Sequence, residues 1–451
     1  MKILIINGSP KGEYSITLQT VEYLKALFPD HEYSTLHVGK RIKAFEKDFS
    51  PAKEALRDAE LVIFSYPVYT FIAPYQLHRF IELVKESGIS LEGKCATQIT
   101  TSKHFYDITA HRYIEDNCAD LGFRYIRGLS ADMDDLITEK GQREAREFFE
   151  FVIYSAVNGL FERPSASVSK AVHMPVSVPS ADSDKKEGDI VIVTNCRAED
   201  TALSSMIERF SAVIPRKTRV VNIAEYPFTG GCLGCFGCAT DGKCVYKDGF
   251  DEFLRGNIQS GEAIVYAFSI KDHSMGASFK LYDDRQFCNG HRTVTMGMPM
   301  GYLVSGNYSE EYNLQTIIEG RAQVGGNFLA GVATDEQDPD GEIDKLAARL
   351  EYAIEKMYAP PSNFLGVGGM KIFRDLIYLM RGMMKADHKF YKKHGQYDFP
   401  QKKRGTLVKM YLVGALISSP KLKAKLGNSM NEGMIAPYKK VLDKVNKEDK
   451  K

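Results

Sequence analysis

The sequence predicts an α/β protein with two doubly wound parallel sheets in tandem, each of strand order 2-1-3-4-5, followed by a helical appendage. Short β-branched runs alternate with segments of helical spacing, which is typical of parallel βαβ units. This alternation lapses once and then restarts, and a chain of 451 residues is too long for one hydrophobic core. We therefore expect domains at 1–164 and 189–359, a linker at 165–188 and an extension at 360–451.

Five runs of strand length lie in the first half, and segments of helical spacing separate them. In one such segment, from Leu77 to Val84, apolar residues recur at helical spacing, so this helix would cover one side of the sheet. Parallel strands joined by helices in this way form a doubly wound sheet. The predicted strands are residues 2–7, 31–37, 61–66, 94–100 and 123–126, and the helix is 73–85.

Between residues 165 and 188 the sequence loses its periodicity and is rich in Ser, Pro, Val and Lys, which predicts a linker. The second half then repeats the order of strands and helices. Its predicted strands are 189–194, 217–223, 263–269, 299–305 and 327–333, and its helices are 201–213, 313–325 and 341–357. Beyond Pro361 only helices are predicted, at 371–384, 407–418 and 431–445.

Composition indicates a soluble globular chain, since 44% of the residues are hydrophobic and 26% are charged. No apolar run reaches about 18 residues, so we expect a cytoplasmic protein without a transmembrane segment. The net charge of +1 hides a basic tail, because residues 361–451 carry 20 Lys and Arg against 7 Asp and Glu. We expect this tail to dock as a lid, with a solvated basic face as the alternative. No module that reads nucleic acid is recognisable, so no nucleic-acid partner is predicted.

A loop that fits a phosphate follows the first strand. Gly8-Ser9-Pro10-Lys11 leads into a helix through Ser15 and Thr17. Small residues, hydroxyls and a basic side chain at a helix N-terminus gather N–H groups at the positive end of the helix dipole. The spacing of a dinucleotide fingerprint or a Walker loop is missing, so a monophosphate such as that of FMN fits better. An ordinary strand-to-helix turn is the alternative.

Two further loops converge on the same crevice, because strands one and three flank the topological switch point of a 2-1-3-4-5 sheet. The loop after strand three carries aromatic side chains that can lie against a flat ring, unless they only cap the core. The loop after strand four carries hydroxyls and a cation that would tune a flavin. It also carries an imidazole, for which an exposed position is the alternative. The predicted catalytic residues are Tyr69 and His104, with His104 as a proton donor. The predicted cofactor-binding residues are Ser9, Pro10, Lys11, Ser15 and Thr17 at the phosphate and Pro67, Val68, Tyr69, Thr70, Phe71, Thr101, Ser102 and Lys103 around the ring.

The phosphate loop, the Tyr66-Pro67-Val68-Tyr69 turn and the Thr100-Thr101-Ser102 loop together resemble the NADPH-dependent FMN reductase branch of the flavodoxin-like superfamily. The resemblance covers residues 1 to about 160. It implies FMN as the cofactor and NAD(P)H as the hydride donor. The electron acceptor is not identified by the sequence.

Four of the eight cysteines fall in one short loop of the second half, as Cys232-x2-Cys235-x2-Cys238-x5-Cys244 among glycines. Four close thiols are a ligand set for an iron-sulfur cluster or for structural zinc. Three cysteines at every third residue plus a fourth nearby favour a 4Fe-4S cluster, because zinc usually binds two pairs with a longer spacer. Unmetallated or redox-active thiols are the remaining alternative.

The cysteine loop also resembles that of iron-sulfur flavoproteins, flavodoxin-like oligomers in which the cluster approaches the FMN of a neighbouring subunit. This implies either a homo-oligomer or a pairing of the two halves within the chain. The second half lacks a glycine in its own phosphate loop and carries Glu199 and Asp200 there, which would repel a phosphate. We therefore expect one FMN in the first half, faced by the cysteines of the second.

These features predict a flavin-dependent oxidoreductase that takes hydride from NAD(P)H on FMN and passes electrons on through a 4Fe-4S cluster. One alternative is an iron-sulfur flavoprotein that carries electrons to and from a ferredoxin-like partner. Another is a non-catalytic interaction protein with a zinc-stapled loop.

Overall fold

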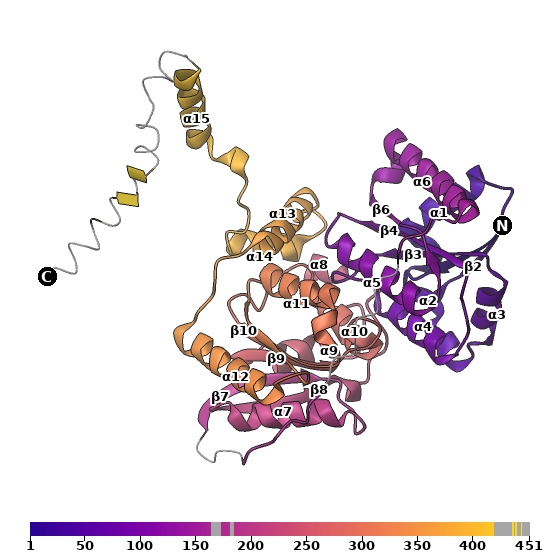
Figure 1. Cartoon of the computed structure of the whole chain (residues 1–451). Coiled ribbons are helices and arrows are strands. Elements are labelled where there is room, and N and C mark those ends of the chain that lie inside the picture. Colours follow the sequence, from indigo (N-terminus) through magenta and orange to yellow (C-terminus); the bar gives the residue numbers. More distant parts are fainter. Residues whose placement is uncertain (164–172, 181–184, 419–434, 437, 440–442, 444–451) are drawn as a thin grey trace. The chain divides into compact units, whose positions relative to one another are not determined.

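The computed structural model describes residues 1–163, 173–180 and 185–418, together with five positions beyond residue 434. The chain divides into two compact units, Met1–Tyr391 and Lys392–Lys451. Both sheets belong to the first unit (Figure 1). The helix predicted at 431–445 lies mostly outside the described residues.

The first sheet has the predicted order, β2-β1-β3-β4-β5, with every neighbouring pair parallel and β6 paired with β4. Ile3 of β1 lies opposite Leu61 of β3, which in turn lies opposite Cys95 of β4. The fifth strand is shorter than predicted, and the separate strand β6 follows it. The strands are β1 (Lys2–Asn7), β2 (Glu32–Leu36), β3 (Leu61–Pro67), β4 (Cys95–Ser102), β5 (Arg124–Tyr125) and β6 (Leu129–Asp132).

Helices cover both faces of this sheet (Figure 1). Because side chains alternate along a strand, Ile3 and Ile5 pack towards α1 and α6, whereas Leu4 and Ile6 pack towards α2, α4 and α5. All four side chains are buried, so the sheet is the middle of three layers. The helices are α1 (Ile16–Leu27), α2 (Val38–Lys47), α3 (Ser50–Asp58), α4 (Tyr75–Glu86), α5 (Asp107–Asp120) and α6 (Glu139–Asn158).

The second sheet repeats the order of the first, as β11-β10-β9-β7-β8. Helices α7 and α12 pack on one face, and α9, α10 and α11 pack on the other. The strands are β7 (Lys186–Thr194), β8 (Arg216–Asn222), β9 (Ala263–Ser269), β10 (Pro299–Ser305) and β11 (Phe328–Thr334). The helices are α7 (Thr201–Val213), α8 (Gly237–Asp241), α9 (Phe250–Phe253), α10 (Gly276–Arg285), α11 (Tyr312–Gly325) and α12 (Pro339–Lys356). The predicted fold class, two tandem doubly wound sheets, is confirmed.

Beyond α12, the described residues up to 418 include the helices α13 (Phe364–Leu379), α14 (Lys385–Lys393) and α15 (Arg404–Ile417). The first begins seven residues before the predicted start at 371, because Asn363 caps it and glycines in its first turns pack instead of breaking it. A Cβ at Gly366 would stand 2.8 Å from the carbonyl oxygen of Gln323, and one at Gly369 would stand 2.6 Å from Val324. Glycine therefore lets α13 approach α11 closely.

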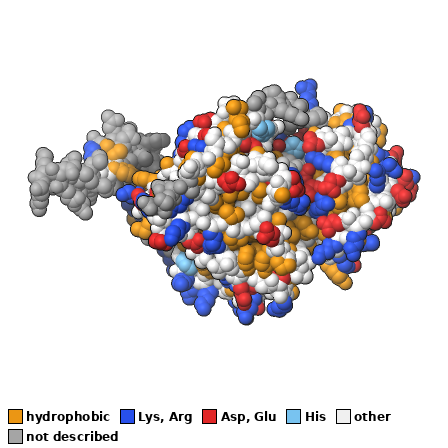
Figure 2. All heavy atoms as spheres, turned by 90° about the horizontal axis from the view of Figure 1, so that it is seen from below, with side chains coloured by type: hydrophobic (Ala, Val, Ile, Leu, Met, Phe, Trp, Pro, Cys, Tyr) orange, Lys and Arg blue, Asp and Glu red, His pale blue; other side chains and the backbone are white. Residues whose placement is uncertain are grey.

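The described helices include none that is long and apolar enough to cross a membrane. On the face shown in Figure 2, Lys and Arg side chains lie among Asp and Glu side chains. The opposite charges are thus intermixed on this face.

The two halves pair through equivalent elements. Helix α4 packs on α10, and α5 packs on α11, and each pair occupies the same place in its own half. After the third strand of each half comes the same tight turn, with positive φ at Thr70 and Phe71 in the first half and at Asp272 and His273 in the second. Each turn contacts the opposite half. The chain is thus built like a dimer of two related units.

His273 of the second half lies between two carboxylates, Asp120 of the first half and Glu311 of its own half. Its Nε2 lies 3.0 Å from Asp120 Oδ2 on α5, and its Nδ1 lies 2.9 Å from Glu311 Oε1. Burial alone would lower the pKa of this imidazole, but the two carboxylates outweigh burial and raise the pKa to about 10.

We expect His273→Gln to destabilise the protein at pH 6 and much less at pH 10. Because the folded pKa of about 10 lies above the reference value of 6.5, the charged ring stabilises fully below pH 6.5, and the effect fades as pH rises through 10. One pKa unit corresponds to about 1.4 kcal/mol. Because solvent partly screens the pair, we expect the loss in free energy of unfolding to be about 2 kcal/mol larger at pH 6 than at pH 10. Urea unfolding of both proteins at the two pH values measures it. An equal loss of stability at both pH values would contradict a raised pKa at His273.

Candidate active site

The loop after β1 is held in shape by one buried side chain, Asn7. Its Nδ2 donates to the carbonyl oxygen of Gly12 at 2.9 Å, and its Oδ1 accepts from Ser9 N at 3.1 Å. Gly12 has a φ of +57°, which glycine adopts without strain, so the loop can turn before the helix begins. Ser15 then caps α1, with its Oγ accepting from Leu18 N at 3.4 Å. The loop therefore presents the N-terminus of α1 at the end of β1.

A cavity of about 400 Å³ begins at this loop and extends into the second half of the chain. That volume is typical of cofactor and small-molecule sites. Thr17 Oγ1 and Thr101 Oγ1 lie 2.6 Å apart and join the first turn of α1 to the end of β4. The predicted site residues that line the cavity are Ser9, Lys11, Ser15, Thr17, Pro67, Val68, Tyr69, Thr70, Phe71, Thr101, Ser102, Lys103, Cys232, Cys235, Cys238 and Cys244.

Two predicted site residues, Pro10 and His104, are not among the described residues that line this cavity. Pro10 is buried within its loop. His104 has a φ of +56°, its ring is half exposed, and its Nδ1 lies 2.8 Å from Asp107 Oδ2. This histidine lines a separate cavity instead. Although its backbone N donates to Ser102 Oγ at 2.8 Å, His104 does not line the cavity that holds most of the predicted site residues.

Lys103, the cation predicted near the flavin, lines the main cavity but is already paired. Its Nζ lies 2.6 Å from Asp132 Oδ1 and also contacts Asp134. Burial would lower the pKa of this amine, but the two carboxylates raise it. Lys103 is thus charged, with much of that charge offset locally.

The turn after β3 has a strained backbone. Tyr69 N donates to the carbonyl oxygen of Ile72 at 2.8 Å, and Ile72 N donates back to Tyr69 at 3.1 Å. Between them Thr70 and Phe71 have φ values of +44° and +74°, which side-chain-bearing residues adopt only when their surroundings hold them. Burial raises the pKa of the Tyr69 phenol well above its ordinary value, so this predicted catalytic group keeps its proton.

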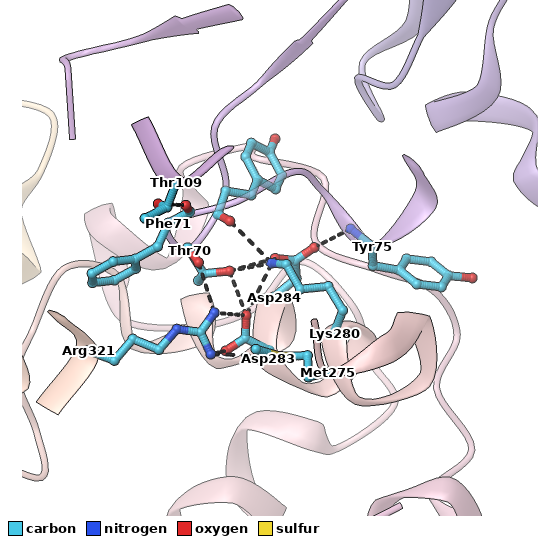
Figure 3. A network of polar contacts seen from close by, with 10 residues as sticks. Thr70, Phe71, Tyr75, Thr109, Met275, Lys280, Asp283, Asp284 and Arg321 are labelled. Carbon is cyan, nitrogen blue, oxygen red and sulfur yellow. Dashed lines mark hydrogen bonds and ion pairs between the residues drawn. The ribbon is translucent and has the colours of Figure 1, made fainter. Parts of the chain in front are cut away.

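Figure 3 shows that side chains of the second half hold this turn. Thr70 Oγ1 donates to Asp283 Oδ2 on α10 at 2.7 Å, and Arg321 Nη2 on α11 donates to the carbonyl oxygen of Thr70 at 2.8 Å. Lys280 Nζ on α10 donates to the carbonyl oxygen of Tyr69 at 3.2 Å. The conformation of a turn in one half therefore depends on charged residues of the other.

These charged residues form a network shielded from water. The side chains of Lys280 and Asp284 are fully buried, and Lys280 Nζ contacts Asp284 and lies 3.1 Å from Asp283 Oδ2. Asp284 Oδ2 accepts from Tyr75 N at 2.7 Å, where its charge meets the positive end of α4. Burial raises the pKa of Asp284, whereas Arg321 and Lys280 overcome burial at Asp283 and lower its pKa.

The cysteine loop lies against the first half and forms another wall of the cavity. Lys11 Nζ in the phosphate loop stands 5.6 Å from the centre of the Phe236 ring. A Cβ at Gly234 would stand only 1.9 Å from Tyr69 Oη, so glycine is required at this contact. Residues from both halves thus enclose the same space.

The four cysteines Cys232, Cys235, Cys238 and Cys244 share this wall of the cavity. Cys235 is exposed, and the other three are partly exposed. Burial raises the pKa of Cys238 to about 11 and also raises that of Cys232, so both hold their protons near neutral pH without a cation beside them. Across the described residues, no three His, Cys, Asp or Glu side chains lie close enough together for one metal ion.

The donor set of the first half fits FMN. Buried hydroxyls of Ser9 and Thr17, with the Lys11 amine, surround a helix N-terminus, which suits a phosphate. Phe71 and Phe105, with ring centres 4.9 Å apart, line the part of the cavity formed by the next two loops and suit a flat ring.

Sequence reasoning missed the buried network and much of the cavity wall from the second half. Lys280, Asp283 and Asp284 are spaced i, i+3 and i+4, which places a cation and two acids on one helix face, and this signal was available. The segment from Gln286 to Thr295 and three residues of α13 also line the cavity. No local sequence motif identifies these residues, because tertiary packing brings them to the cavity.

Residues 1–143 match the family model described as the flavodoxin-like fold. The strand order of both sheets agrees with that fold. The match covers less than half of the chain and ends before the second half begins. Among curated proteins none matches the chain at a significant level.

Several solved structures resemble about a third of the chain. Smu.1420 from Streptococcus mutans UA159 is 17% identical, covers 35% of this chain and 100% of its own, and has a TM-score of 0.28. An FMN-dependent NADH-azoreductase from Bacillus anthracis, solved with FMN, is 13% identical with 36% and 100% covered and a TM-score of 0.27. The NAD(P)H:quinone oxidoreductase of Methanothermobacter marburgensis is 14% identical with 36% and 97% covered and a TM-score of 0.27. At such scores the fold assignment rests on the family match and the strand order instead.

Proposed function

We propose that this protein is an FMN-dependent oxidoreductase that uses NAD(P)H and works in the cavity between its two halves. The observation that supports this most is that the phosphate loop, the two loops expected at the flavin ring and the cysteine loop line one cavity of about 400 Å³. The family match over residues 1–143 agrees with it. The flavin would supply hydride uptake from the nicotinamide and electron release to an acceptor.

The residues of this chain would bind the flavin and orient its ring. Ser9, Lys11 and the N-terminus of α1 would hold the phosphate. The turn from Tyr69 to Phe71, fixed by the buried network, would lie against the ring, and Thr101 and Ser102 would meet its polar edge. The cysteine loop and α13 would exclude water, which strengthens the electrostatic interactions within the site.

Anaerobic purification with FMN, followed by NADH and NADPH oxidation assays, tests the proposal. We expect a yellow protein with one FMN per chain and acceptor-dependent oxidation of at least one nicotinamide. A quinone, an azo dye and ferricyanide serve as acceptors. Absence of FMN binding would contradict the proposal. FMN that only a ferredoxin-like protein reduces would instead favour the electron carrier.

The 4Fe-4S cluster remains a prediction, favoured by four cysteines on one wall of the cavity. No step of the proposed reaction runs through a cluster. If the loop closes around a cluster, Cys235→Ala should remove bound iron and the broad absorption near 400 nm while FMN stays bound. Iron analysis of anaerobic protein measures this, with Cys196→Ala as the control outside the loop. Equal iron in both variants, or zinc in its place, would contradict the cluster.

A further inference from the structure

Aromatic side chains from three parts of the chain follow one another around the cavity. Phe105 of the first half stacks on Phe373 of α13 at 4.2 Å, and Phe373 meets the edge of His291 at 4.9 Å. His291 lies 6.3 Å from Phe287, which lies 5.9 Å from Tyr69. All five side chains line the cavity. His291 is the one imidazole among them, and it comes from the second half.

A buried carboxylate on α14 fixes the orientation of this imidazole. His291 Nδ1 lies 3.0 Å from Asp387 Oδ2, and the backbone N of His291 donates to the same oxygen at 3.1 Å. Asp387 is fully buried. A carboxylate at Nδ1 makes that nitrogen the proton-bearing one, as in other Asp-His pairs. Nε2, on the other side of the ring, has no hydrogen-bond partner among the residues that the structure describes.

The contact between α14 and the His291 segment is close and specific. Tyr391 Oη donates to the carbonyl oxygen of His291 at 3.1 Å. Gly290 has a φ of +62°, and a Cβ there would stand 2.4 Å from Asp387 Oδ1, so only glycine allows the carboxylate to approach. Arg292 Nε, 3.5 Å from the same oxygen, offsets its charge. These contacts hold the imidazole in one position on the cavity wall.

We propose that His291 is the proton donor to the electron acceptor and that Asp387 is its positioning residue. This rests on the proposed function. An acceptor with a C=O or N=N bond that takes two electrons as hydride also needs a proton. The N–H bond at Nε2 of the charged imidazole breaks as an O–H or N–H bond forms on the acceptor, and solvent returns the proton to the ring. The nicotinamide is oxidised and the acceptor is reduced. Ferricyanide, which takes one electron and no proton, needs no such donor.

The test compares His291→Gln with His104→Gln and the wild type after FMN loading and reduction by dithionite. The reduced enzymes are mixed with an azo dye or with ferricyanide. We expect His291→Gln to reduce the dye about 100-fold more slowly and ferricyanide within about twofold of the wild type. Equal losses with both acceptors would indicate a merely structural role and overturn the proposal, and so would a selective loss in His104→Gln. Because dithionite replaces the nicotinamide, failure of NAD(P)H oxidation alone would count against the proposed function only.

A second measurement needs no flavin and no turnover. Nitrogen-15 NMR of the histidine rings distinguishes a proton on Nδ1 from one on Nε2. In the wild type we expect the neutral His291 ring, identified by its absence from His291→Gln, to carry its proton on Nδ1. Asp387→Asn should lose that preference and reduce the azo dye about tenfold more slowly. A neutral His291 protonated on Nε2 in the wild type would overturn the positioning role.

Discussion

Ser9→Asp is expected to weaken FMN binding about a thousandfold. Ser9 is buried in the phosphate loop, where its Oγ accepts from Lys11 N at 3.3 Å. An aspartate there would place a negative charge beside the phosphate. Two like charges about 4 Å apart at an effective dielectric constant of about 20 repel by about 4 kcal/mol, which is about three orders of magnitude in Kd. Titration of the apoprotein with FMN, followed by flavin fluorescence, measures the change.

Ser9→Asn is the matched control, because asparagine has the shape of aspartate without its charge. It loses the serine hydrogen bonds, so a decrease of about tenfold in FMN affinity is expected. If both variants lost affinity equally, the effect would come from side-chain size. Full FMN occupancy in Ser9→Asp would place the phosphate elsewhere.

Much of the fold follows from local pattern. The strands β9 and β10 begin and end where the sequence predicts, because buried parallel strands are short apolar runs bounded by turns. The βαβ alternation and the right-handed crossover rule predict a doubly wound parallel sheet, and 2-1-3-4-5 is the flavodoxin-like one of its two common strand orders. The sequence predicts too late a start for α13 because Gly366 and Gly369 have low helix propensity, and only the close contact with α11 explains why glycine lies there.

The candidate site also has one part that the local sequence predicts and one part that it does not. The loop from Ser9 to Thr17 is recognisable because a phosphate site needs contiguous residues at a helix N-terminus. His291 and Asp387 are 96 residues apart, and the sequence around neither of them indicates the other. His104 follows the expected strand, but it has a positive φ and its ring contacts Asp107. The residue therefore lines another cavity. Tertiary packing therefore decides which imidazole reaches the cavity.

Lys280→Met is expected to lower the free energy of unfolding by about 3–5 kcal/mol, the range for removing one partner of a buried ion pair. Methionine fills a similar volume, so the main loss is the charge that faces Asp283 and Asp284. The turn at Tyr69 would also lose its bond from Lys280 Nζ, and FMN affinity should fall with it. Lys2→Met is the control, since Lys2 pairs with Asp58 on the surface and should change the free energy by less than about 1 kcal/mol.

A double-mutant cycle separates the ion network from simple loss of packing. Asp284→Asn alone leaves Lys280 Nζ beside a neutral amide and weakens the bond to Tyr75 N at the start of α4. In the double variant Lys280→Met with Asp284→Asn, the charge of Asp283 still meets Arg321, whose Nη1 lies 2.6 Å from Asp283 Oδ1, and no charge at position 280 or 284 is left unpaired. The double variant should therefore be more stable than the sum of the single losses predicts, by about 1–3 kcal/mol. Urea unfolding of the four proteins gives this coupling, and strictly additive losses would show that Lys280 and Asp284 do not stabilise each other. A coupling in stability together with a matching coupling in FMN affinity would mean that the second half controls the cofactor site of the first.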